Sequence, residues 1–101
     1  MPDAHLTIPQ ALKLAGQHER AGQAKDAQTI YERVLNAQPD HVAARKGLAR
    51  LLRSRGDAKS AIDTLRLGLA ARPKSVEFQR DLAALLRSSG RLEEAIETHR
   101  H

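Results

Sequence analysis

The chain repeats itself every 34 residues, and this period limits its fold more than any other feature of the sequence. Gly22, Gly56 and Gly90 mark the interval most clearly, because each lies 34 residues from the next. The same interval separates Leu14, Leu48 and Leu82, Ala15, Ala49 and Ala83, Ala27, Ala61 and Ala95, and Pro39 and Pro73. A fixed period of about 20–50 residues is typical of repeat proteins, in which each unit packs mainly on its neighbours.

Each unit contains the pattern of two helices. In the second unit, apolar residues recur every three or four positions over residues 42–52 and again, after Gly56, over residues 58–69. That spacing places them on one face of a helix. Glycine readily ends a helix, and proline cannot continue one. We therefore expect helices near residues 8–21, 24–37, 41–55, 58–71, 75–89 and 92–101.

Capping residues stand before several of these helices. Thr7 and Gln10 form a capping-box pattern, and Pro9 is tolerated in a first helical turn. Short polar side chains that accept a hydrogen bond from the first turn are favoured at the N-cap. The predicted N-caps of three later helices are Asp40, Asp57 and Ser75.

The repeated alanines predict close contact between neighbouring helices, because a larger side chain would push the backbones apart. We therefore predict an all-α fold, a right-handed helical solenoid of antiparallel helix pairs, with the first helix of each pair on the concave side. The length of 101 residues suits one domain. We expect a leader at 1–7 and a domain at 8–101, whose units are 8–41, 42–75 and an incomplete 76–101.

The repeating unit resembles a tetratricopeptide repeat. The resemblance rests on the period, the Leu-Ala pairs, the glycines, the second-helix alanines, a large side chain at Tyr31 and Leu65, and the prolines. It extends over about residues 8–101 and implies a protein-interaction module without enzymatic activity. Some positions depart from the family pattern and are expected to weaken packing: Ala11, Arg45 and Gln79 in place of Trp, and Gly68 in place of Ala.

The third unit stops before its expected proline, and no polar capping helix follows. The open apolar ends of a solenoid need a cap. Either the chain belongs to a larger protein, or its open end docks on a second copy, or its last helix frays. We favour the first, because residues 8–12 and 38–41 resemble repeat regions of large bacterial proteins, some of which carry a transferase domain.

The composition excludes several kinds of chemistry. Cysteine is absent, so disulfides, Cys-ligated zinc and thiol catalysis are excluded. No phosphate-binding glycine loop, nucleophile elbow or pair of histidines at ligand spacing occurs, so we expect no catalytic residue, metal or cofactor. The first residues lack the basic and apolar segments of a secretory leader, and no apolar run is long enough to span a membrane. We expect a cytoplasmic protein that does not contact membranes.

The net charge of +5 comes from one predicted helix. Residues 41–55 contain five basic residues and no acidic one, which leaves twelve of each sign in the rest of the chain. Lys46, Arg50 and Arg53 are spaced so that they form one stripe, and the repeat geometry places this stripe on the concave side. Further arginines, Arg20, Arg80 and Arg87, should flank it, while Glu19, Glu77 and Asp81 dilute its charge without cancelling it.

Two interpretations of the stripe remain open. It is either a solvated face that keeps an alanine-rich solenoid soluble, or a basic groove that binds an acidic segment of a partner protein. Nucleic acid is a third class of partner, but single-strand binders normally use exposed aromatic rings. Tyr31 and Phe78, the two aromatic residues of the chain, are expected in the core.

Overall fold

Five α-helices form the part of the chain that the computed structural model describes, residues 6–88. They are α1 (Ile8–Arg20), α2 (Ala24–Ala37), α3 (Val42–Ser54), α4 (Ala58–Ala71) and α5 (Val76–Ser88). Each begins and ends within one residue of its predicted range. The sixth expected helix, 92–101, lies outside the described residues. Every helix within residues 6–88 is too short or too polar to cross a lipid bilayer.

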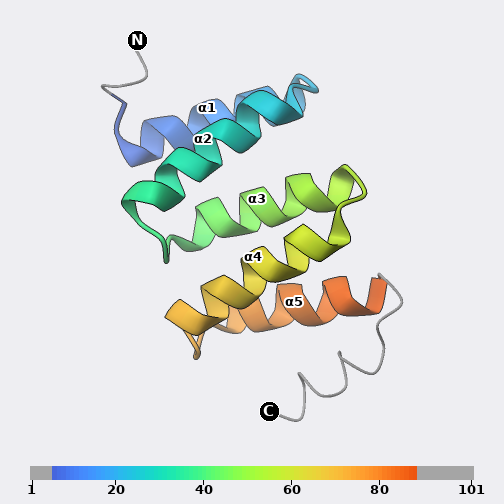
Figure 1. Ribbon diagram of the computed structural model, residues 1–101. Helices are drawn as coiled ribbons and strands as arrows, with labels where there is room; N and C mark the ends of the chain where they lie inside the picture. The colour runs from blue at the N-terminus through green and yellow to red at the C-terminus, as the bar shows by residue number, and fades with distance from the viewer. Residues whose placement is uncertain (1–5, 89–101) are drawn as a thin grey trace.

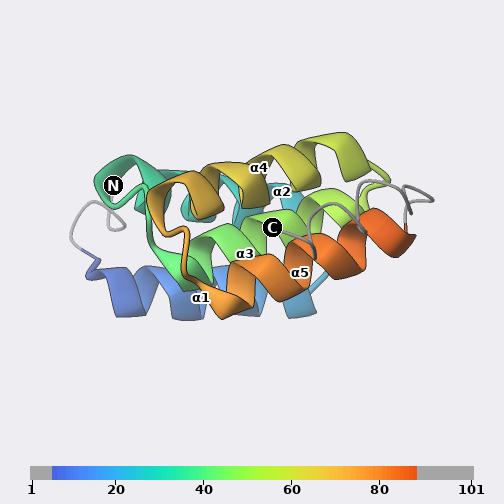
Figure 2. The same cartoon turned by 90° about the horizontal axis from the view of Figure 1, so that it is seen from below.

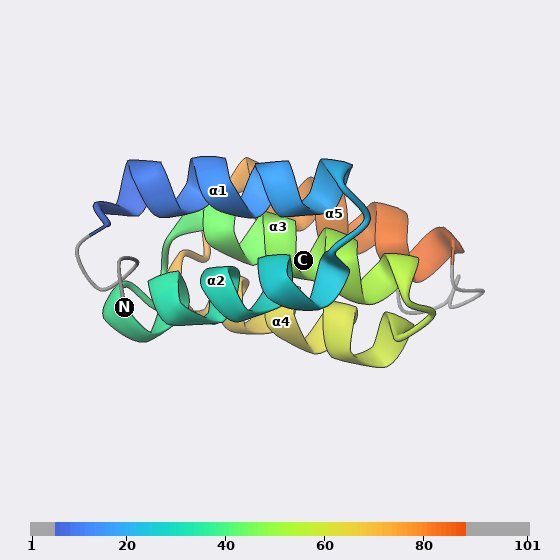
Figure 3. The same ribbon diagram turned by 90° about the horizontal axis from the view of Figure 1, so that it is seen from above.

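The helices stack in chain order as antiparallel neighbours, with α1 against α2, α2 against α3, α3 against α4, and α4 against α5 (Figure 1). Two layers result. Seen from either end of the stack, α1, α3 and α5 form one layer and α2 and α4 form the other (Figures 2 and 3). This arrangement confirms the predicted all-α, right-handed solenoid, whose first helices share one side.

The two described turns within a unit are built alike. Gly22 and Gly56 have φ angles of 78° and 82°, in the left-handed region that glycine adopts without strain. Beyond each glycine, a backbone N–H returns to the preceding helix. Gln23 donates to the carbonyl of His18, and Asp57 donates to that of Leu52. These bonds end α1 and α3 and reverse the chain.

Most of the predicted caps are confirmed. Thr7 and Gln10 form both hydrogen bonds of the capping box, and the side chain of Asp57 accepts from the backbone N–H of Ser60. Ser75 likewise accepts from the N–H of Phe78.

The N-cap of α3 was predicted wrongly. His41, not Asp40, holds that position, and its Nδ1 atom accepts from the N–H of Ala44. The carboxylate of Asp40 is instead 3.2 Å from a guanidinium nitrogen of Arg72, which also donates from Nε to the Asp40 carbonyl. The side chain that would cap α3 therefore links two successive loops.

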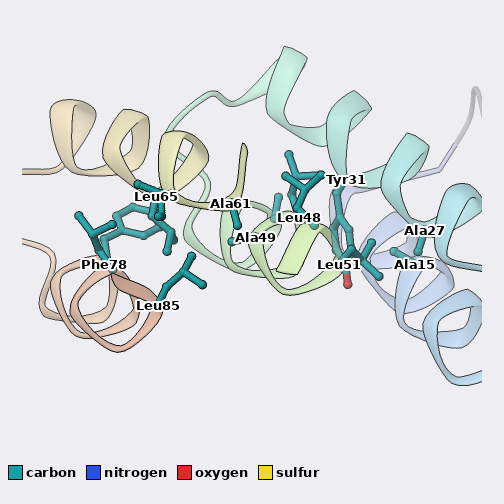
Figure 4. Close-up of a cluster of buried hydrophobic side chains, with 14 of the residues drawn as sticks. Ala15, Ala27, Tyr31, Leu48, Ala49, Leu51, Ala61, Leu65, Phe78 and Leu85 are labelled. Atoms are coloured by element: carbon teal, nitrogen blue, oxygen red, sulfur yellow. The ribbon is translucent and has the colours of Figure 1, made fainter. Parts of the chain in front are cut away.

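A continuous apolar core runs along the stack (Figure 4). The repeated alanines are buried where helices meet, as predicted, at Ala15, Ala27, Ala49, Ala61 and Ala83. Tyr31 and Phe78 are also buried, as expected, and lie toward opposite ends of the cluster in Figure 4.

Each aromatic ring packs on a helical glycine of the next helix. A Cβ atom on Gly47 in α3 would lie 2.7 Å from Cε1 of Tyr31, and one on Gly68 in α4 would lie 2.9 Å from Cε2 of Phe78. Such distances leave no room for a methyl group unless the ring moves. The expectation that Gly68 weakens packing was therefore wrong, because this glycine makes the space that the ring of Phe78 occupies.

Candidate partner-binding groove

The helix α3 places Lys46, Arg50 and Arg53 along one side, facing the layer of first helices. All three side chains border a hollow of about 270 Å³ between α3 and α5. Apolar side chains of α3, α4 and α5 form much of its remaining surface. The hollow is lined by Lys46, Ala49, Arg50, Arg53, Leu65, Asp81, Ala84 and Leu85.

Arg50 is held from the side of α1 by Glu19. Its Nε and Nη2 atoms donate to the two carboxylate oxygens of Glu19 at 2.9 and 2.7 Å. The hydroxyl of Tyr31 donates to the same carboxylate at 2.5 Å. A paired fork of this kind is among the stronger polar contacts in proteins. The Glu19, Tyr31 and Arg50 side chains, which we call the Glu19 network, therefore join α1, α2 and α3.

The pKa directions agree with this geometry. The hydrogen bond from Arg50 holds the pKa of Glu19 below its ordinary value of 4.5, and the bond to Glu19 raises the pKa of Arg50. Burial, together with the hydrogen bond to Glu19, raises the pKa of Tyr31 to about 12. At neutral pH the network therefore contains a carboxylate, a guanidinium and an uncharged phenol.

Lys46 is paired toward α5. Its Nζ atom is 2.9 Å from Oε1 of Glu77 and 3.9 Å from Oδ2 of Asp81. The side chains of Lys46 and Glu77 are 34% and 58% exposed, so solvent screens this pair more than the Glu19 network. The expectation that the acids dilute the stripe without cancelling it was wrong for Lys46 and Arg50, because acidic residues of the neighbouring units neutralise both.

Arg53 keeps its charge available at the hollow. It is exposed, lines the space between α3 and α5, and has no acidic partner among residues 6–88. Arg80 and Arg87 are exposed on α5, one unit beyond Lys46 and Arg53. Arg20 lies at the end of α1, where its guanidinium is close to Gly16 and its charge helps to lower the pKa of Glu19. None of these last three arginines lines the hollow.

Two other basic residues of α3 and its C-cap point elsewhere. Arg45 donates from Nε to the carbonyl of Pro39 at 2.7 Å and from Nη1 to that of Thr64 at 3.3 Å. Arg55 donates to the side-chain oxygen of Gln28 on α2. The charge that the sequence concentrates in one helix is therefore divided in space between the groove, the loops and the second-helix layer.

Other kinds of site have little support in this part of the chain. Residues 6–88 contain no cluster of three His, Cys, Asp or Glu side chains that could hold a metal ion. Both aromatic rings are buried, so no base-stacking surface exists over the same residues.

The helix-pair solenoid defines the chain as a helical-repeat protein, a class in which units stack along one axis. The family model described as tetratricopeptide repeat matches residues 18–80. The chain belongs to the tetratricopeptide repeat family. Comparison with curated proteins finds no match.

Solved structures support the same fold. The type III secretion translocator chaperone SycD of Yersinia enterocolitica superposes with a TM-score of 0.81 at 23% identity, covering 91% of this chain and 69% of SycD. MamA from AMB-1 superposes with a TM-score of 0.75 at 25% identity, covering 98% of this chain and 54% of MamA. The chain thus spans about two thirds of SycD and about half of MamA.

Proposed function

We propose that this chain is a protein-interaction module that binds an acidic segment of a partner protein in the hollow between α3 and α5. Membership of the tetratricopeptide repeat family supports a binding role for the layer of first helices. The observation that carries the proposal is Arg53, an exposed cation without an acidic partner among residues 6–88, at the edge of a partly apolar hollow.

The remaining contacts suggest how an acidic segment is held. Arg53 would pair with a carboxylate, while Ala49, Ala84 and Leu85 offer apolar contact beside it. Arg50 uses Nε and Nη2 on Glu19, and no residue within 6–88 accepts from its Nη1 atom, which remains free to donate to a partner. Each exposed charge pair adds only about 0.2–1 kcal/mol, so apolar contacts must supply part of the affinity.

A labelled peptide in which Glu alternates with Leu tests the proposal by fluorescence anisotropy. We expect binding to the full chain that weakens between about 50 and about 500 mM salt, since exposed ion pairs are screened. The peptide with Lys in place of Glu should not bind. Either equal binding of both peptides or no binding of the Glu peptide would refute the proposal.

A charge-reversal variant locates the binding surface. The variant Arg53→Glu with Arg80→Glu and Arg87→Glu spares Lys46 and Arg50, whose ion pairs support the fold. We expect it to bind the Glu peptide at least about tenfold more weakly. The matched control reverses the same number of charges away from the hollow, as Lys25→Glu, Lys59→Glu and Lys74→Glu. Equal loss in both variants would mean that general charge, and not the groove, drives binding.

A further inference from the structure

A second hollow lies on the outer face of the first unit, away from the groove. It has a volume of about 160 Å³ and lies between the start of α1 and the end of α2. Apolar side chains dominate its surface, among them Leu6, Ile8, Ala11, Ile30 and Val34. It shares no lining residue with the hollow between α3 and α5.

The repeat shows what normally fills this place. Ala11, Arg45 and Gln79 stand one unit apart, at the same position of α1, α3 and α5. Arg45 donates to the carbonyl of Pro39 at 2.7 Å, and Gln79 donates to that of Pro73 at 2.9 Å. The second and third units thus place a long side chain across the start of their first helix. The methyl group of Ala11 cannot reach as far.

The residues opposite this position differ in the same sense. Ile30 and Val34 of α2 correspond to Thr64 and Gly68 of α4. In the second unit, Arg45 donates to the carbonyl of Thr64, and its Cδ atom would lie 3.0 Å from a Cβ atom on Gly68. In the first unit the corresponding space is bordered by two branched apolar side chains instead. It is therefore both emptier and more apolar than its counterpart.

We propose that this hollow binds an aromatic side chain of a partner protein, an interaction that goes beyond the acidic-segment function and does not depend on it. An apolar cavity of about 150 Å³ is large enough for a benzene ring. A second copy of the chain is a poorer occupant. Over residues 6–88 both of its rings are buried, and its exposed large apolar residues are Leu6, Leu67 and Val76.

Methyl NMR on the full chain, labelled at Ile, Leu and Val, tests the proposal. The probe is a Gly-Ser peptide with one central Trp, and the reference peptide has Ala in its place. We expect the Trp peptide to shift the methyl signals of Ile8, Ile30 and Val34, and the Ala peptide to leave them unchanged.

Two variants make the test specific. Ala11→Arg copies the residue of the second unit into the hollow and should weaken Trp-peptide binding at least about tenfold. Ala70→Arg adds the same side chain at an exposed site of α4 and should bind like the parent. Should Ala11→Arg fail to fold, as judged by circular dichroism, Ala11→Leu fills the same space without a charge.

Three results would overturn the inference. One is that the Trp peptide leaves the three methyl signals unshifted, and another is that it shifts them equally in the parent and in the folded variant filled at position 11. The third is a shift of these signals with protein concentration alone, which would identify a second copy as the occupant. Because the groove variant Arg53→Glu, Arg80→Glu, Arg87→Glu leaves this hollow intact, it should still bind the Trp peptide whether or not the acidic-segment proposal holds.

Discussion

The junction between the first and second units differs from the junction between the second and third. Both use an aromatic ring on a helical glycine, but Tyr31 lies in α2 over Gly47 of α3, whereas Phe78 lies in α5 over Gly68 of α4. The hydroxyl of Tyr31 continues into the Glu19 network. Phe78 has no polar atom on its ring and is fully buried.

This difference decides which part of the first-helix layer is open to a partner. At the first junction, Glu19 satisfies the fork of Arg50 and draws its charge inward. At the second junction, Lys46 makes a more exposed pair with Glu77, and Arg53 stays without an acidic partner among residues 6–88. Identical spacing in the sequence therefore produces one junction closed by polar contacts and another that borders a hollow.

The largest expected effect tests the feature that the two junctions share. Gly47→Ala should lower the free energy of unfolding by about 2–3 kcal/mol, because the new methyl group would collide with the ring of Tyr31. Gly68→Ala should cost somewhat less, since its contacts with Phe78 are slightly longer. Urea denaturation at neutral pH measures both changes.

Gly16→Ala is the matched control, because its nearest neighbouring atom would lie 3.6 Å away, at an ordinary contact distance. Since alanine favours a helix interior over glycine by about 1 kcal/mol, this variant should be as stable as the parent or more stable. Equal destabilisation at Gly16 and Gly47 would show that the ring contact is unimportant.

The next effect should distinguish the junctions by pH. Because the folded-state pKa of Glu19 is lowered from 4.5, its ionised form stabilises the fold above that pH, and the contribution is lost as pH falls through the folded-state pKa. Glu19→Gln should cost about 1–2 kcal/mol at pH 7 and progressively less in acid. Urea denaturation of parent and variant between pH 7 and pH 3 checks this, and a constant difference would contradict it.

The smallest effect is expected at the exposed pair of the second junction. Lys46→Ala should change the free energy of unfolding by less than about 1 kcal/mol, since the partners Glu77 and Asp81 are substantially exposed. Thermal melts at low and high salt should show that this small contribution is screened. A loss as large as that of Glu19→Gln would remove the contrast between the junctions.

Much of the fold follows from the sequence. Helical spacing and the glycine and proline signals predict the helix ranges to within one residue, because they are local features of the chain. The burial of the repeated alanines, and of Tyr31 and Phe78, also follows from the repeat. The cap of α3 does not, since Asp40 is drawn away by Arg72 from a distant loop.

The site depends on how one unit is rotated against the next, which a period of 34 residues does not reveal. Glu19 pairs with Arg50, and Lys46 with Glu77, and both pairs are separated by 31 residues. A search for opposite charges at that second spacing could have found them. The contact of Tyr31 with Gly47 has no comparable signal, because a helical glycine looks like a weak helix position until its neighbour is known.

The most direct test of the proposed groove is a nitrogen-15 NMR titration of the full chain with the alternating Glu-Leu peptide. Binding between α3 and α5 predicts that the largest amide shifts cluster around Ala49, Arg53, Ala84 and Leu85, with small shifts along α2. The largest shifts along α2 and the outer side of α4, or no localised shifts at saturation, would contradict the account.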